Sequence, residues 1–152
     1  MPSASAGILG YRKRREVEVL LVHPGGPFWR NKDLGAWSIP KGEYADEEDA
    51  ETAARREFAE ELGLELSMPL LALGQVKQRG GKIVTAFAAE FDVDVRSIRS
   101  NSFEMEWPPR SGLRATFPEV DKAAWFDAPT GLWKIHKGQQ PILREAIGRL
   151  NP

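Results

Sequence analysis

Cysteine is absent from the chain, and so is any long apolar run. The lack of cysteine excludes disulfides, thiolate nucleophiles and cysteine zinc sites, and it is typical of proteins that work in a reducing compartment. No second histidine or cysteine lies near His23 in the sequence, so we interpret His23 as a strand-end residue and not as a metal ligand. No apolar segment approaches the roughly 18 residues that cross a membrane.

An excess of one charge is also missing, because the formal net charge is −1. We therefore expect no bulk electrostatic attraction to nucleic acid or to a membrane surface. Residues 1–15, MPSASAGILGYRKRR, place their charges after a very short apolar stretch, which is the reverse of the order in a signal peptide. The expectation is a cytoplasmic protein, a monomer or a homodimer, with a single domain over residues 1–152.

The most informative stretch is residues 42–64, GEYADEEDAETAARREFAEELGL. We predict a helix over residues 49–62, with Asp46 as a candidate N-cap and Gly63 as the glycine that ends it. Apolar residues recur every four positions on one face of this helix: Ala54, Phe58 and Leu62.

Three carboxylates lie on a neighbouring face of the same helix. Glu57, Glu60 and Glu61 stand at i, i+3 and i+4, which brings them within about one turn. Like charges at this spacing repel each other and destabilise an isolated helix. A hard divalent cation would relieve the repulsion, and Mg²⁺ prefers carboxylate oxygens together with retained waters.

The spacing of these residues resembles a known signature, the Nudix box of the Nudix hydrolases. The matching positions are Gly42, Glu48, Arg56, Glu57, Phe58, Glu60, Glu61, Gly63 and Leu64. Phe58 stands where the family usually has an aliphatic residue, and it still supplies an apolar contact. Residues 37–41, WSIPK, resemble the strand that leads into the box.

The resemblance implies a Nudix fold, which is an α/β fold with a mixed β-sheet sandwiched between α-helices. It also implies a pyrophosphohydrolase that cleaves a phosphoanhydride bond in a nucleoside diphosphate linked to another moiety. The implied cofactor is Mg²⁺, with Mn²⁺ as an alternative, and the implied partner is a small-molecule nucleotide. A metal ion neutralises phosphate oxygens and lowers the pKa of bound water, so it addresses both obstacles to this hydrolysis.

The resemblance assigns the metal to four groups: the carbonyl of Gly42 and the carboxylates of Glu57, Glu60 and Glu61. Glu57 is also a candidate for the general base, although the acid that acts as base varies across the family. Glu60 is therefore a candidate catalytic residue as well. Arg56 would orient the carboxylates through an ion pair with Glu48. The alternative for Arg56 and Glu48 is a surface ion pair of little energetic value.

Acids downstream of the box are further candidates. Glu104 and Glu106 are two residues apart, so in an extended segment both would project to one side and could reach the metals. The alternative is an exposed strand face. Glu119 is a weaker candidate for the same role.

Candidate substrate contacts lie before the box and in the loops. Lys41 could contact a phosphate, and Phe28 or Trp29 could stack on a base. The alternative for the aromatic pair is a loop pinned by its own side chains. Three basic residues flank a predicted turn and are expected to be solvated: Lys77, Arg79 and Lys82.

Several loops together suggest the substrate class. They contain five aromatic residues and several arginines, which favours a long phosphate chain, as in a nucleoside triphosphate or a dinucleoside polyphosphate. The alternatives are a sugar-linked diphosphate such as ADP-ribose, or a non-catalytic nucleotide-binding sensor. Because the chain keeps every carboxylate of the box, the enzyme is favoured over the sensor.

Strands interrupted by one long helix and closed by another predict an α/β fold with a mixed sheet. The expected strands are residues 4–11, 17–23, 36–39, 68–78, 82–93, 103–107 and 120–126. Residues 24–35, 41–42 and 111–118 are expected as loops, residues 129–134 as a helical turn, and residues 139–150 as an amphipathic helix.

Overall fold

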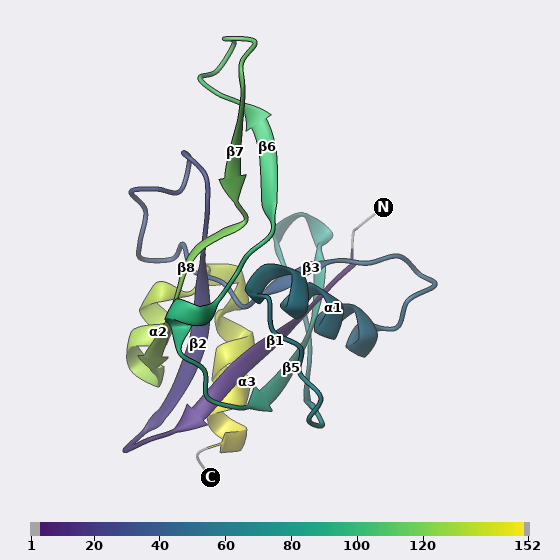
Figure 1. Cartoon of the computed structure of the whole chain (residues 1–152). Coiled ribbons are helices and arrows are strands. Elements are labelled where there is room, and N and C mark those ends of the chain that lie inside the picture. The colour runs from purple at the N-terminus through teal and green to yellow at the C-terminus, as the bar shows by residue number, and fades with distance from the viewer. Residues whose placement is uncertain (1–3, 151–152) are drawn as a thin grey trace.

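The chain forms a mixed six-stranded β-sheet with helices on both faces (Figure 1). The computed structural model describes residues 4–150, so residues 1–3 and 151–152 of the expected domain lie outside the described part. The strands of this sheet are β1 Ala4–Lys13, β2 Val17–Pro24, β3 Lys41–Glu43, β4 Leu71–Lys77, β5 Ile83–Glu90 and β8 Val120–Asp127. Their order in the sheet is β4-β5-β1-β2-β8, and β3 pairs with β1. The pairing of β1 with β5 is parallel and the other pairings are antiparallel.

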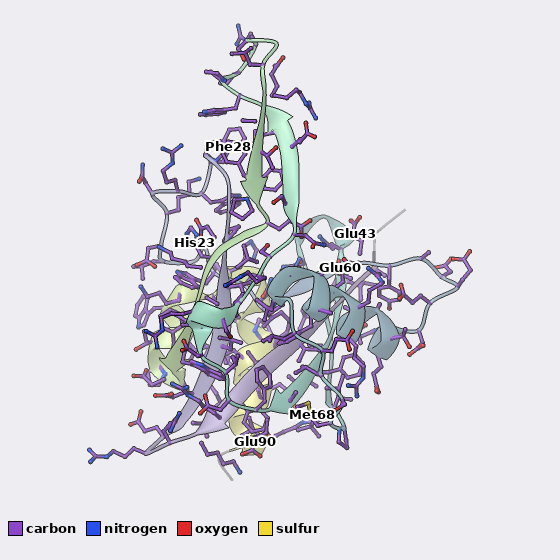
Figure 2. All side chains as sticks on the ribbon, in the orientation of Figure 1. His23, Phe28, Glu43, Glu60, Met68 and Glu90 are labelled. Atoms are coloured by element: carbon purple, nitrogen blue, oxygen red, sulfur yellow. The ribbon has the colours of Figure 1, made fainter. Side chains whose placement is uncertain are left out.

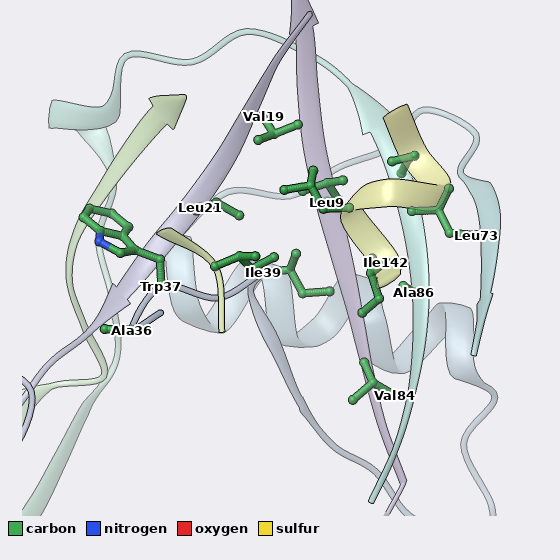
Figure 3. Close-up of a cluster of buried hydrophobic side chains, with 14 residues drawn as sticks. Leu9, Val19, Leu21, Ala36, Trp37, Ile39, Leu73, Val84, Ala86 and Ile142 are labelled. Atoms are coloured by element: carbon green, nitrogen blue, oxygen red, sulfur yellow. The ribbon is translucent and has the colours of Figure 1, made fainter. Parts of the chain in front are cut away.

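The three α-helices of residues 4–150 divide between the two faces of the sheet. Helix α1 (Ala50–Leu62) packs on one face, where Phe58 and Leu62 are fully buried. Burial of each such side chain contributes about 1.5–3 kcal/mol to the free energy of unfolding. Helices α2 (Ala128–Lys134) and α3 (Gln140–Leu150) cover the second core, which Figure 3 shows around Leu9, Trp37 and Ile142. The expected α/β architecture is therefore confirmed.

One edge of strand β1 pairs along its length with β5, and the other edge is divided between two partners, which places β3. Its second half pairs with β2, whereas Ser5, Ala6 and Gly7 pair with β3. A Cβ on Gly7 would lie 2.6 Å from the carbonyl oxygen of Pro40 and 2.7 Å from Cβ of Lys41. The close approach of β3 to β1 therefore requires glycine at position 7.

The N-cap of helix α1 lies three residues later than expected. Asp49, and not Asp46, is the N-cap: its Oδ2 accepts the backbone N–H of Thr52 at 3.1 Å and its Oδ1 accepts the hydroxyl of Thr52 at 2.6 Å. An N-cap must bond the N–H groups of the first turn, and Thr52 lies three residues beyond Asp49. Gly63 ends the helix with φ 70°, as expected, in the left-handed conformation that glycine adopts without strain.

Three loop and strand predictions near the site are wrong. Residues 36–39 form no strand, because Trp37 and Ser38 make only isolated bridges to Ile135 and Val22. Residues 41–42, expected as a loop, belong to β3 (Lys41–Glu43), since the small Gly7 allows this strand to pair with β1. Residues 114–118, also expected as a loop, form β7 (Arg114–Pro118), which pairs with β6 (Ser102–Glu106).

The β6–β7 hairpin projects away from the rest of the molecule (Figure 1). Phe28 reaches it from the loop after β2 and meets the ring of Trp107 edge-on at 5.8 Å (Figure 2). Phe28 therefore connects the loop after β2 to the turn end of the hairpin, as expected for a loop pinned by its aromatics.

His23 is fully buried at the end of β2, so its placement as a strand-end residue is confirmed. Its Nδ1 lies 2.8 Å from Oδ1 of Asp121 and its Nε2 lies 2.6 Å from the carbonyl oxygen of Lys32. These contacts fasten the loop after β2 to β8. Across residues 4–150, the helices are all too short or too polar to cross a membrane.

Candidate active site

Gly42 and Glu57 form the centre of the candidate site. Strand β3 passes beneath α1, and a Cβ on Gly42 would overlap the carboxylate of Glu57. The side chain of Glu57 is 13% exposed. Only glycine therefore allows this carboxylate to lie directly on the backbone of β3.

Glu61 is the most deeply buried of the box carboxylates. It is 9% exposed, and its Oε2 accepts the backbone N–H of Lys41 at 3.2 Å. Burial raises the pKa of Glu61 to about 8, and the charges of Glu57 and Glu119 add to the rise. A carboxylate in this position carries its negative charge at a cost, and a cation would remove that cost.

Arg56 connects the carboxylates. Its guanidinium makes two hydrogen bonds to Glu48, of 2.9 and 3.0 Å, so the expected ion pair is present. Its Nη1 donates to Oε1 of Glu57 at 2.8 Å and lies 3.4 Å from Oε1 of Glu60. The bonds from Glu48 and Glu57 raise the pKa of Arg56 further above its usual range. Arg56 is therefore fixed on one side by Glu48 and holds Glu57 on the other.

Glu60 and Glu119 lie where α1 meets the segment before β6. The N–H of Asn101 donates to the backbone carbonyl of Glu60 at 3.1 Å, and the carbonyl of Asn101 accepts the N–H of Glu119 at 2.8 Å. Figure 2 shows Glu60 on the side of α1 that faces the foot of the hairpin. Burial raises the pKa of Glu119, and the charges of Glu57 and Glu60 raise it further. Glu119 is therefore a fourth acid beside the box carboxylates.

Glu104 and Glu106 have other contacts, although both are exposed on the same side of β6 as expected. Oε1 of Glu104 lies 3.7 Å from Nε of Arg114, on the partner strand of the hairpin. The carboxylate of Glu106 accepts the N–H groups of Arg110 and Gly112 at 3.0 and 3.2 Å. These bonds close the turn at the hairpin tip, so Glu106 has a structural role there.

The donor set suits a hard divalent cation. Carboxylate oxygens and a backbone carbonyl are the ligands that Mg²⁺ accepts. Burial first, and then the charges of neighbouring glutamates, raise the pKa values of Glu61 and Glu119. Within residues 4–150, however, no three acidic or imidazole groups already converge as a complete metal site does. Arg56 contacts two of the box carboxylates, Glu57 at 2.8 Å and Glu60 at 3.4 Å.

A cavity of about 450 Å³ lies beside β3. Its lining includes Trp29, Lys41, Gln78, Lys82, His136 and Gln139. Lys41 borders both sites, because its backbone N–H binds Glu61 while its side chain lines the cavity. Burial lowers the pKa of Lys41, and the charge of Lys82 lowers it further. The two expected substrate contacts, Lys41 and Trp29, therefore lie in one cavity.

Two residues, Glu119 and Lys82, lie closer to the candidate site than the sequence indicates. Glu119 precedes β8, and the backbone of Asn101 joins it to Glu60, a contact that no spacing in the sequence reveals. Lys82 was expected to be solvated, but it lines the cavity. It stands just before β5, and both β5 and β3 pair with β1. The sequence signal for Lys82 is its position in the short turn before a predicted strand.

Comparisons with known proteins bear on the family and the fold. An RNA pyrophosphohydrolase of Caulobacter vibrioides is 43% identical over 56 residues, which are 34% of this chain and 33% of that protein. The match thus spans about a third of the length of the curated relatives.

Two solved structures are similar over nearly the entire chain. The structure of a C. elegans Ap4A hydrolase binary complex has a TM-score of 0.69 and 21% identity, and the similarity covers 96% of this chain and 97% of that one. The NUDIX domain of Shewanella oneidensis NrtR complexed with ADP ribose has a TM-score of 0.66 and 17% identity, with 99% and 90% covered. Both share the fold described above. The model of the NUDIX domain matches residues 1–146, and the chain therefore belongs to the Nudix family.

Proposed function

We propose that this Nudix domain is a pyrophosphohydrolase that cleaves the phosphoanhydride bond of a nucleoside diphosphate linked to another moiety. The observation that carries the proposal is the position of Glu57 on Gly42, where any side chain would displace the carboxylate. Glu61 and Glu119 add two further carboxyl groups around this position, and their raised pKa values mean that a bound cation would favour their charged forms. A helix face evolved only for solubility has no need to bury Glu61.

The metal would be held by four groups: the carbonyl of Gly42 and the carboxylates of Glu57, Glu60 and Glu61. Glu119 would add a fourth carboxylate. When bound, Mg²⁺ or Mn²⁺ supplies neutralisation of the phosphate oxygens and acidifies a water molecule.

The protein supplies orientation and proton transfer. Glu48 fixes the guanidinium of Arg56, and Arg56 holds Oε1 of Glu57 at 2.8 Å. Oε2 of Glu57 makes no bond to Arg56 and is the atom we assign to accept a proton from the attacking water. Arg56 therefore acts as a positioning residue for the base.

The substrate is a nucleoside triphosphate or a dinucleoside polyphosphate. The cavity beside β3 supports this class, because it offers the ring of Trp29 for a base and the ammonium groups of Lys41 and Lys82 for phosphate oxygens. Glu104 and Glu106, with their contacts inside the hairpin, have less support as metal ligands than Glu119 has.

The test is a substrate panel with purified protein and Mg²⁺ or Mn²⁺. The panel contains nucleoside triphosphates, dinucleoside polyphosphates, ADP-ribose and 5′-triphosphorylated RNA, and the readout is kcat/KM. We expect the highest kcat/KM for a small-molecule tri- or polyphosphate. A preference for ADP-ribose or for the RNA would overturn the substrate class. Binding without turnover of any compound would favour the sensor.

A further inference from the structure

The cavity beside β3 contains a pair of positive charges. Lys41 stands in β3 opposite Gly7 of β1, and Lys82 precedes Ile83, which lies opposite Ala4 of the same strand. Both side chains line the cavity. Within residues 4–150, neither lysine forms an ion pair with an acidic residue. Two ammonium groups that share a partly desolvated space repel each other, and an anion between them would relieve the repulsion.

The other polar groups of the cavity also suit an anion. None of the residues that line it is acidic. Nδ1 of His136 accepts the N–H of Gly138 at 3.0 Å, which leaves Nε2 as the hydrogen-bond donor of the ring. Gln78 adds an amide at the cavity wall. The cavity therefore presents hydrogen-bond donors and positive charge, which is the complement of phosphate oxygens.

The cavity adjoins the carboxylate site through Lys41, whose N–H binds Glu61 and whose side chain turns to the cavity. Its volume of about 450 Å³ is near the lower end of the roughly 300–1,000 Å³ of small-molecule sites. A substrate bound at both sites would therefore extend its phosphate chain along β3.

We propose that Lys41 and Lys82 form a seat for a third phosphate, and that this seat makes the enzyme prefer substrates with three or more phosphates. The proposal rests on the proposed function, since it takes the two phosphates at the scissile bond to lie at the carboxylates. A two-phosphate substrate such as ADP-ribose leaves the lysine pair without a partner. Lys82 is thus a specificity-determining residue that stands outside the Nudix box.

The first experiment measures anion binding without metal or hydrolysis. Inorganic tripolyphosphate is titrated into the protein in EDTA by calorimetry, for the parent, Lys82→Ala, Lys82→Gln and the control Lys77→Ala. Lys77 is exposed, does not line the cavity and carries the same charge. We expect Kd to rise about tenfold or more for both Lys82 variants, and to change less than about twofold for Lys77→Ala. Equal effects at Lys77 and Lys82, or no binding to the parent at millimolar concentration, would overturn the phosphate seat.

The second experiment measures chain-length preference with adenosine compounds that carry two, three or four phosphates. We expect Lys82→Ala to lower kcat/KM about tenfold more for the longer chains than for ADP-ribose, mainly through KM. Arginine at this position should restore much of the preference, because it keeps the charge.

The two proposals fail in different ways. If tripolyphosphate binding depends on Lys82 but no compound is hydrolysed, the seat stands and the hydrolase is wrong. If hydrolysis occurs with no dependence on Lys82, the hydrolase stands and the seat is wrong. Melting temperatures of both Lys82 variants identify any loss of folding. Alanine and glutamine differ in size and polarity, so a loss of tripolyphosphate binding in both variants reports the removal of the positive charge.

Discussion

The backbone N–H of Lys41 donates to Oε2 of Glu61 at 3.2 Å, and this bond joins β3 to α1 across the candidate site. It gives the buried carboxylate one fixed partner while its other oxygen stays available. It also fixes the residue before Gly42, so the carbonyl that would bind metal and the carboxylates of the helix are positioned by one contact. The site is therefore built from two elements, and changes in either one should affect catalysis.

Glu61→Gln should lower kcat about 100-fold or more and leave the fold intact. The substitution keeps the shape and removes one negative charge from the metal face, where charge stabilisation contributes several kcal/mol. Steady-state kinetics on the best panel substrate checks this, and circular dichroism reports the fold. Glu65→Gln, at an exposed position just after the helix, is the matched control and should have parental kcat. A Glu61→Gln enzyme within a few-fold of the parent would show that Glu61 is not a ligand.

Gly42→Ala should abolish most activity, because its Cβ would overlap the carboxylate of Glu57. The expected signs are weaker Mn²⁺ binding, measured by calorimetry, and a kcat lowered at least tenfold. Gly148→Ala adds the same methyl group in α3, where nothing lies within 4 Å of the new Cβ. It should leave kcat unchanged and raise the free energy of unfolding by up to about 1 kcal/mol. Equal kcat values for the two alanine variants would contradict the placement of the Glu57 carboxylate on Gly42.

The metal-free protein should lose stability as the pH rises from about 5 to about 8. Burial raises the pKa of Glu61 from 4.5 to about 8 in the folded state, so in this window the folded chain binds a proton that the unfolded chain has released. The free energy of unfolding then falls with pH, by at most about 1.4 kcal/mol per unit for one proton. Urea denaturation in EDTA at several pH values measures the slope.

Glu61→Gln is the control for this pH dependence. Because glutamine does not titrate, the variant should have a flatter profile and a higher free energy of unfolding than the parent at pH 8. Added Mg²⁺ should stabilise the parent more at pH 8 than at pH 6, since the ion competes with the proton for Glu61. A parent profile that rises with pH and matches that of Glu61→Gln would refute the assignment.

Glu119→Gln should weaken Mg²⁺ dependence more than Glu104→Gln does. Glu119 lies close enough to Glu57 and Glu60 for their charges to raise its pKa, whereas Glu104 faces Arg114 on the exposed hairpin. We expect the Mg²⁺ concentration for half-maximal activity to rise several-fold for Glu119→Gln and to stay unchanged for Glu104→Gln. The reverse order would place the additional ligand on the hairpin.

Asp49→Ala should cost about 1 kcal/mol of stability, since it removes the cap that bonds Thr52. Asp46→Ala, which tests the position expected from the sequence, should stay within about 0.5 kcal/mol of the parent. Chemical denaturation of both variants decides between the two caps.

Much of the fold and the centre of the site could be predicted from local patterns. The apolar period of α1, its terminating glycine and the spacing of Glu57, Glu60 and Glu61 are properties of one continuous segment, so they can be read in order. The ion pair of Arg56 and Glu48 spans only two turns and was also predictable.

The errors arose where distant segments meet. β3 exists because Gly7 allows it to pair with β1, more than thirty residues earlier in the chain. Glu119 reaches the box through Asn101, and Lys82 reaches the cavity through the pairing of β5 with β1. No spacing within one segment records these contacts. The sequence therefore indicated Glu119 only as a weaker candidate for the metal and Lys82 as a solvated residue.

Gly7 has a consequence for the interpretation of sequence variants. It lies outside the box in the sequence, yet it pairs with Lys41 in the fold, and a Cβ there would press on Pro40 and Lys41 and shift the strand that carries Gly42. In a mutational scan scored by activity, position 7 should therefore behave like an active-site position. A search for catalytic residues by loss of function alone would include it, and only metal and anion binding measured separately would identify its effect as a displacement of β3.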